Sequence, residues 1–193
     1  MKKFLITLSI LVALFSTPSF SKTFISGLIG YAWINSEHYD ENDKVIDAHQ
    51  GPVIQFYLGY LFPVNDTFSV GPEIGLVTNI FIPGDNDQNQ KLLISSSIPV
   101  DIKAKININP NFYFFGRAGM ALVRQVITNS WVFPIGAYSK WQPTFGGGFG
   151  YNINKSLSLE LAYNFTNGNK GITYDEANTS RFQNVSLGVT YSF

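Results

Sequence analysis

The two histidines of this sequence are its nearest approach to a catalytic group. His38 has three possible partners close by, namely Ser36, Glu37 and Asp40, and the second histidine is His49. In a hydrolytic triad, a histidine takes the proton of a serine nucleophile while an acid orients the imidazole. Both histidines fall in one long polar connection, about residues 35–50, so we interpret His38 as a solvated loop residue. We expect no catalytic residues and no enzymatic activity.

A second polar segment partly matches a calcium-binding loop. Asp85, Asp87 and Asn89 have the spacing of its first ligands, but Gln90 stands where glycine is needed and Ser96 where a bidentate glutamate belongs. We therefore interpret the segment as a solvated tip. The sequence has no cysteine, which excludes Cys-ligated zinc, iron–sulfur clusters and thiol nucleophiles. We predict no metal site.

Glycines and overall charge give equally little support for phosphate chemistry. Gly146, Gly147 and Gly148 with Gly150 weakly resemble a phosphate-binding loop, but alternate glycines in a strand more simply make room for bulky neighbours such as Arg117. Lys and Arg number 13, and so do Asp and Glu, which leaves no basic excess for a nucleic acid backbone. We expect no cofactor and no nucleic acid partner.

The elements that carry these residues follow a period of two. In Leu157–Thr166 the residues Leu157, Leu159 and Leu161 share one face while Ser158 and Glu160 share the other, as in a strand with one apolar face. The same alternation occurs in eight segments, about residues 25–33, 54–62, 68–76, 94–108, 112–122, 142–153, 157–166 and 185–193.

The first 21 residues have a different character. Lys2 and Lys3 precede an almost wholly apolar run, Phe4–Phe15, and a small-x-small pattern ends at Ser21. This order is typical of a secretory signal peptide, and the apolar run is shorter than the roughly 20 residues that a spanning helix needs. We predict a signal peptide over 1–21 and one domain over 22–193.

Connections between the strands alternate in length. Three are short turns, at Pro63–Asp66, Asn109–Asn111 and Asn154–Ser156, and four are long and polar, at about 35–50, 83–90, 126–140 and 167–180. Long loops at one end and tight turns at the other are typical of barrels in bacterial outer membranes. The predicted fold class is all-β, an eight-stranded antiparallel up-and-down transmembrane β-barrel.

Charges on the strands indicate which face is inside. Six charged residues lie on the polar face, about four to eight residues from the nearest short turn: Glu73, Asp101, Lys103, Lys105, Arg117 and Glu160. Three acids balance three bases, as a confined interior requires, since an unpaired buried charge is costly. We predict that these six form an interior ion-pair layer and that the apolar face contacts lipid.

Aromatic residues gather near both ends of the strands, as in the two aromatic girdles of such barrels. One group lies near the short turns (Tyr60, Phe62, Phe68, Phe112, Tyr151, Tyr191 and Phe193) and one near the long connections (Tyr31, Trp33, Trp141 and Phe165).

With these features the sequence resembles the small bacterial outer-membrane barrels of the OmpA/OmpX type and the opacity-like surface proteins. The resemblance covers about residues 22–193 and includes VGPEIG at Val70–Gly75 and the final VTYSF. It implies that Val189, Tyr191 and Phe193 form the signal read by the barrel-assembly machinery. It also implies a monomer in the outer membrane, in contact with lipid and lipopolysaccharide.

We therefore expect a non-enzymatic barrel whose interior is filled by side chains and whose four long connections serve envelope integrity, adhesion or host interaction. A narrow channel or transport barrel is one alternative. A lipid A-modifying enzyme is another, although the His-x-Ser pattern carried on a strand of such deacylases is missing. A soluble periplasmic barrel is a third.

The acids Glu37, Asp40, Glu41 and Asp43 could hold divalent cations that bridge lipopolysaccharide, but more simply they keep the connection solvated.

Overall fold

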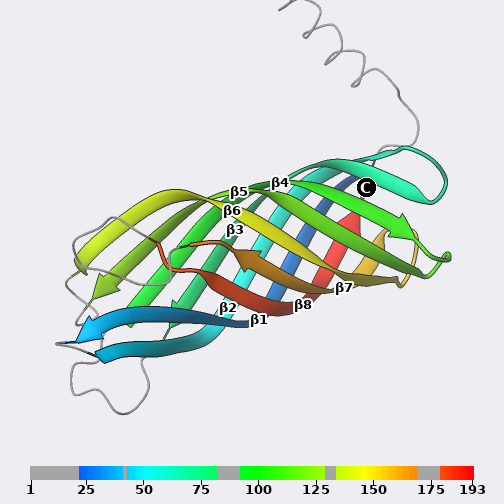
Figure 1. Cartoon of the computed structure of the whole chain (residues 1–193). Coiled ribbons are helices and arrows are strands. Elements are labelled where there is room, and N and C mark those ends of the chain that lie inside the picture. Colours follow the sequence, from blue (N-terminus) through cyan, green and yellow to red (C-terminus); the bar gives the residue numbers. More distant parts are fainter. Residues whose placement is uncertain (1–21, 41–42, 82–91, 129–133, 169–178) are drawn as a thin grey trace, which may run out of the picture.

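The chain forms a closed barrel of eight strands in which every strand pairs antiparallel with its neighbour and β8 pairs with β1 (Figure 1). The computed structural model describes residues 22–40, 43–81, 92–128, 134–168 and 179–193. The strands are β1 (Lys22–Asp40), β2 (Asp43–Pro63), β3 (Phe68–Phe81), β4 (Leu92–Asn107), β5 (Phe112–Thr128), β6 (Pro134–Asn152), β7 (Leu157–Thr166) and β8 (Phe182–Ser192). The predicted fold class is confirmed.

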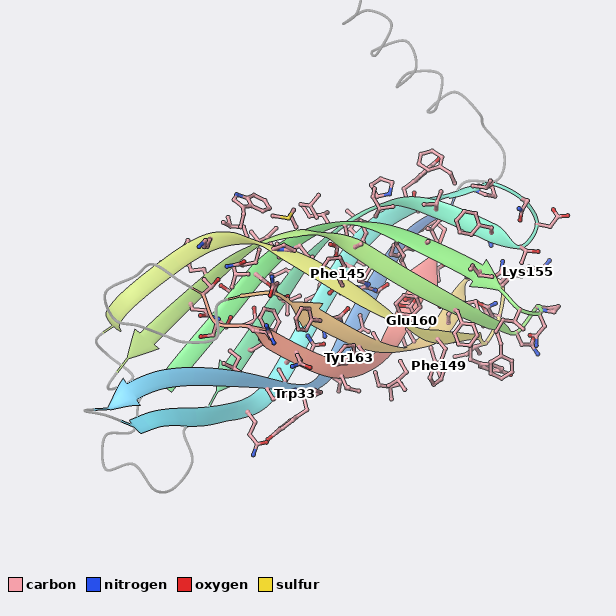
Figure 2. The ribbon with its side chains drawn as sticks, viewed as in Figure 1. Trp33, Phe145, Phe149, Lys155, Glu160 and Tyr163 are labelled. Atoms are coloured by element: carbon pink, nitrogen blue, oxygen red, sulfur yellow. The ribbon has the colours of Figure 1, made fainter. Side chains whose placement is uncertain are left out.

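Alternation along each strand separates an exposed apolar outer face from a buried lumen that holds polar and charged side chains together with some apolar ones. On β6 and β7 the side chains of Phe145, Phe149 and Tyr163 are 42–52% exposed, whereas Glu160 is 1% exposed (Figure 2). On β2 the exposed Phe56 alternates with the buried Gln55 and Tyr57 in the same way. Large exposed hydrophobic residues in such number would be unfavourable in water but match a lipid environment.

An asparagine fixes each of the three short turns. Asn65 Oδ1 accepts hydrogen bonds from the backbone N–H groups of Thr67 and Phe68 at 2.9 and 2.8 Å. Asn109 and Asn154 do the same in the β4–β5 and β6–β7 turns. Because the side chain satisfies backbone donors that the turn leaves unpaired, asparagine suits this position. The predicted turn positions are confirmed.

Two of the predicted long connections are mostly strand, so those predictions were wrong. β1 and β2 stay paired to Asp40↔Asp43, and β5 and β6 cover most of residues 126–140. His38 and His49 are therefore strand residues, opposite Val45 and Ile34. The prediction relied on the alternation of apolar residues, which is expected only where a strand faces lipid. Backbone hydrogen bonds keep the strands paired beyond that point. The segment 83–90, the predicted signal peptide and most of 167–180 lie outside the described residues.

Glycines of β6 allow large side chains to stand beside that strand in the lumen. A Cβ on Gly146 would collide with Asn164 Oδ1 and lie 2.9 Å from Arg117 Cγ. One on Gly148 would collide with the backbone carbonyl of Leu161 on β7 and lie 2.9 Å from Phe115 Cζ. At Gly150 a Cβ would collide with the ring of Tyr113. These glycines make room for interior neighbours, as the sequence indicated, and thereby position the site described below.

Candidate functional site

A buried ion pair crosses the lumen near the short-turn end. Lys103 on β4 and Glu160 on β7 are each 1% exposed, and Lys103 Nζ lies 2.9 and 3.2 Å from the two carboxylate oxygens. The hydroxyl of Tyr113 donates a third hydrogen bond to Glu160, at 2.9 Å. Lys103 Nζ also stands over the rings of Phe24 and Phe115, 4.7 and 4.5 Å from their centroids. Both charges are thus compensated.

A second ion pair connects β5 to β3 across the intervening strand. Arg117 Nε lies 3.1 Å from Glu73 Oε1, and both side chains are almost wholly buried. The guanidinium stacks over Tyr57, 4.1 Å from the ring centroid. Asp101 is the register partner of Glu73 on β4 and is 3% exposed, so a second carboxylate accompanies this pair.

Lys105, the sixth predicted charge, lies nearer the short turns than the other five. It is half-buried, and its Nζ stands 3.7 Å from the centroid of the Tyr113 ring. It lines an open pocket at this end of the barrel rather than the buried interior. The structure therefore brings five of the six residues into the enclosed lumen and places Lys105 at its mouth.

Polar side chains that the sequence analysis did not single out form the next level of the lumen. Gln55 Nε2 on β2 donates to Asn184 Oδ1 at 2.7 Å and to Ser186 Oγ at 2.5 Å, both on β8. Asn164 Nδ2 on β7 donates to Gln55 Oε1 at 3.1 Å, and Tyr57 donates to the same oxygen at 2.9 Å. All lie on the polar face of their strands, which was the signal for an interior position.

Chain from the last connection enters the lumen at the opposite end. Thr179 and Ser180 are 0% and 1% exposed. Gln125 on β5 binds the backbone of Ser180 through both amide atoms, accepting from its N–H at 2.9 Å and donating to its C=O at 3.3 Å. Gln142 on β6 donates to Thr179 Oγ1 at 2.9 Å. These bonds hold a connecting segment inside the end of the barrel.

The outer face carries aromatic pairs near the short turns. Tyr60 packs against Phe62, Phe112 against Tyr151 and Tyr191 against Phe193, with ring centroids 4.6–5.0 Å apart. A fourth pair, Trp33 and Tyr163, lies toward the other end. An apolar belt between aromatic rings, around a polar and ion-paired lumen, is the pattern of a barrel in a bacterial outer membrane.

The comparisons with known proteins agree with that pattern. The family model described as "Outer membrane protein beta-barrel domain" matches residues 7–193. The chain belongs to this outer-membrane barrel family. It is a bacterial outer-membrane protein. No curated protein matches it.

Solved structures similar to this outer-membrane barrel share its fold at low identity. Ail, the attachment invasion locus protein of Yersinia pestis, is 17% identical with a TM-score of 0.53. The match spans 91% of this chain and 100% of the Ail chain. Neisserial surface protein A is 12% identical with a TM-score of 0.52, and the match spans 91% of this chain and 100% of that protein's chain. OprG from Pseudomonas aeruginosa is 12% identical with a TM-score of 0.52, and the match spans 90% of this chain and 96% of the OprG chain.

The residues predicted to form the assembly signal of this outer-membrane barrel lie at the end of its last strand. Val189, Tyr191 and Phe193 lie on the outer face, 46–73% exposed, where β8 closes the barrel against β1. Over the described residues, no group of three or more His, Cys, Asp or Glu side chains could hold a metal ion. No helix in the described ranges is both long and apolar enough to cross a membrane.

Proposed function

We propose that this protein is a non-enzymatic outer-membrane barrel whose lumen is filled by its own side chains and whose projecting segments contact molecules outside the cell. The observation that carries the proposal is the succession of ion pairs and side-chain hydrogen bonds across the lumen. The pairs Lys103–Glu160 and Arg117–Glu73 occupy one level, and the Gln55 amide network occupies the next. An eight-stranded barrel is just wide enough for side chains to fill it.

The paired ends of β1 and β2, residues 35–40 and 43–48, form a ribbon. This ribbon supports the proposed contact with molecules outside the cell. β1 pairs with β8 only as far as Ile34, whereas its pairing with β2 continues to Asp40. The ribbon therefore projects beyond its neighbour β8 at the end opposite the short turns. Residues 35–50 carry five acidic side chains and one lysine, so we expect contacts there with cationic groups or with anions bridged by divalent cations.

Planar bilayer recording tests the filled lumen. We expect the folded protein to give no stepwise conductance, and regular steps that change in Arg117→Ala would establish the transport alternative instead. Heat-dependent mobility on a gel confirms that each sample is a folded barrel.

Binding of whole cells to host cell layers tests the projecting ribbon. We expect the variant Asp40→Asn/Glu41→Gln/Asp43→Asn to reduce binding severalfold. Asp66→Asn, on the β2–β3 turn at the other end, is the control and should leave binding unchanged. Equal binding by all three proteins would refute this role of the ribbon.

A further inference from the structure

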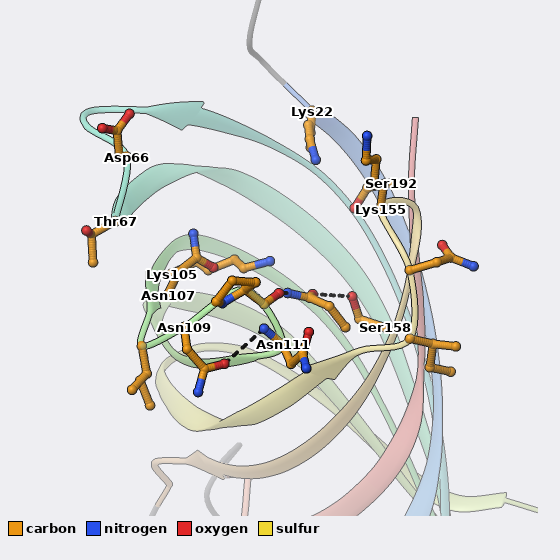
Figure 3. A pocket seen from close by; sticks show the side chains of 15 residues that line it. Lys22, Asp66, Thr67, Lys105, Asn107, Asn109, Asn111, Lys155, Ser158 and Ser192 are labelled. Carbon is orange, nitrogen blue, oxygen red and sulfur yellow. Dashed lines mark hydrogen bonds between the residues drawn. The ribbon is translucent and has the colours of Figure 1, made fainter.

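A polar pocket opens at the short-turn end of the barrel (Figure 3). Its volume is about 660 Å³, and an adjoining pocket of about 450 Å³ shares Lys22, Lys105 and Asp66 with it. Volumes of this size are typical of sites for small molecules. The short turns of outer-membrane barrels face the periplasm, so the pocket opens toward that compartment.

Three lysines on different parts of the chain line the pocket. Lys22 begins β1, Lys105 lies near the end of β4 and Lys155 lies in the β6–β7 turn. Figure 3 shows them around one opening, with Asp66 on the β2–β3 turn at its edge. Among the described residues, none of the three lysines forms an ion pair. The lining therefore has an excess of two positive charges.

The turn asparagines add oriented amide groups to the same lining. Asn109 and Asn154 use their Oδ1 atoms to accept backbone N–H groups within their own turns. This leaves the Nδ2 amide of each as a hydrogen-bond donor among the pocket residues. Uncompensated ammonium groups together with amide donors are the groups that bind phosphate.

The floor of the pocket separates it from the ion pairs of the lumen. Lys105 rests on the ring of Tyr113, which is 1% exposed and whose hydroxyl is bonded to Glu160. Lys103 is bound to Glu160 and is 1% exposed, so it is unavailable to a ligand. An anion entering from the periplasm would thus meet Lys105 as the innermost positive charge.

We propose that this pocket binds a phosphate-bearing anion through Lys22, Lys105 and Lys155. The phosphate belongs either to a free small molecule in the periplasm or to the headgroup of a phospholipid in the inner leaflet of the outer membrane. The site is independent of the ribbon at the opposite end and of any partner that the ribbon contacts.

Calorimetric titration with tripolyphosphate tests the site, using the barrel folded in an uncharged maltoside detergent at low salt. We expect saturable binding to one site that weakens about tenfold in Lys105→Met, because a charge-assisted bond is lost. Lys140→Met removes the same charge on β6 toward the other end and should change the affinity less than twofold. Absence of saturable binding, or equal weakening in the two variants, would overturn the proposal.

Further variants and a lipid comparison complete the test. Lys155→Met alters an exposed turn residue outside the strands, so this variant should fold. It should also weaken tripolyphosphate binding, and it therefore tests the site if Lys105→Met does not fold. Unchanged affinity in Lys155→Met would count against the site. If the ligand is a headgroup, tripolyphosphate should bind more weakly in maltoside micelles that contain phosphatidylglycerol than in micelles given the same negative charge by a fatty acid, which has no phosphate. Equal affinity in the two identifies a free anion.

Discussion

Removing the positive half of the Lys103–Glu160 pair should strongly destabilise the barrel. In Lys103→Met the new side chain keeps the contacts with Phe24 and Phe115, but among the described residues Glu160 retains only the Tyr113 hydroxyl as a hydrogen-bond partner. Removing one partner of a buried pair costs about 3–5 kcal/mol, because the remaining charge is left uncompensated. We therefore expect the free energy of unfolding to fall by about 4 kcal/mol.

Urea unfolding in lipid vesicles, followed by tryptophan fluorescence, measures this loss. With a denaturant dependence of about 2 kcal/mol per molar urea, the midpoint should fall by about 2 M. The double variant Lys103→Met/Glu160→Gln removes both charges and keeps an acceptor for Tyr113, so it should recover most of the loss. Lys105→Met, two residues along β4 and outside the ion pairs of the described residues, should lose less than about 1 kcal/mol.

Two results would refute this reasoning. A shift of less than about 0.5 M in Lys103→Met would mean that water compensates Glu160 in the lumen. A double variant no more stable than the single one would mean that the cost comes from packing around residue 103 rather than from an unpaired carboxylate.

Three other predictions concern packing, turns and catalysis. Gly150→Ala should cost about 1–3 kcal/mol in urea unfolding because its Cβ would meet the Tyr113 ring, whereas Gly116→Ala, with its nearest atom 3.9 Å away, should cost under about 0.5 kcal/mol. Asn154→Ala should cost about 0.5–2 kcal/mol and Asn154→Asp much less, because aspartate keeps the acceptor for the turn; equal losses would contradict that role. Mass spectra of lipid A from cells that carry His38→Ala should equal those of the parent, and a missing or new acyl chain would reveal enzymatic activity.

The sequence predicted the strands well because lipid and lumen impose opposite requirements on alternate residues. Phe56 and Leu58 had to face the lipid once Gln55 and Tyr57 were assigned to the other side, and the structure has that arrangement. Aromatic residues at strand ends and asparagines at short turns depend on local chemistry, which is also visible in the sequence.

Interactions across the lumen could not be predicted in the same way. Glu160 lies opposite Lys103 because of the stagger between strands that are not neighbours, and alternation carries no information on stagger. The same holds for Gln55 and Asn164. The extension of β1 through residues 35–40 and of β2 through 43–50 was missed because polar residues on both faces of a ribbon in water show no alternation of hydrophobicity.

Charge differs between the two ends of the barrel, and this difference separates the two proposed binding roles. Residues 35–50 are strongly acidic, whereas the short-turn pocket has an excess of positive charge. Phosphate groups of lipopolysaccharide would be repelled by the acidic ribbon unless divalent cations joined them, because carboxylate and phosphate oxygens share such cations as ligands. Phosphate at the basic pocket needs no bridging cation. Chelation of divalent cations should therefore weaken contacts with lipopolysaccharide at the ribbon and leave anion binding at the pocket intact, because the lysines bind phosphate directly.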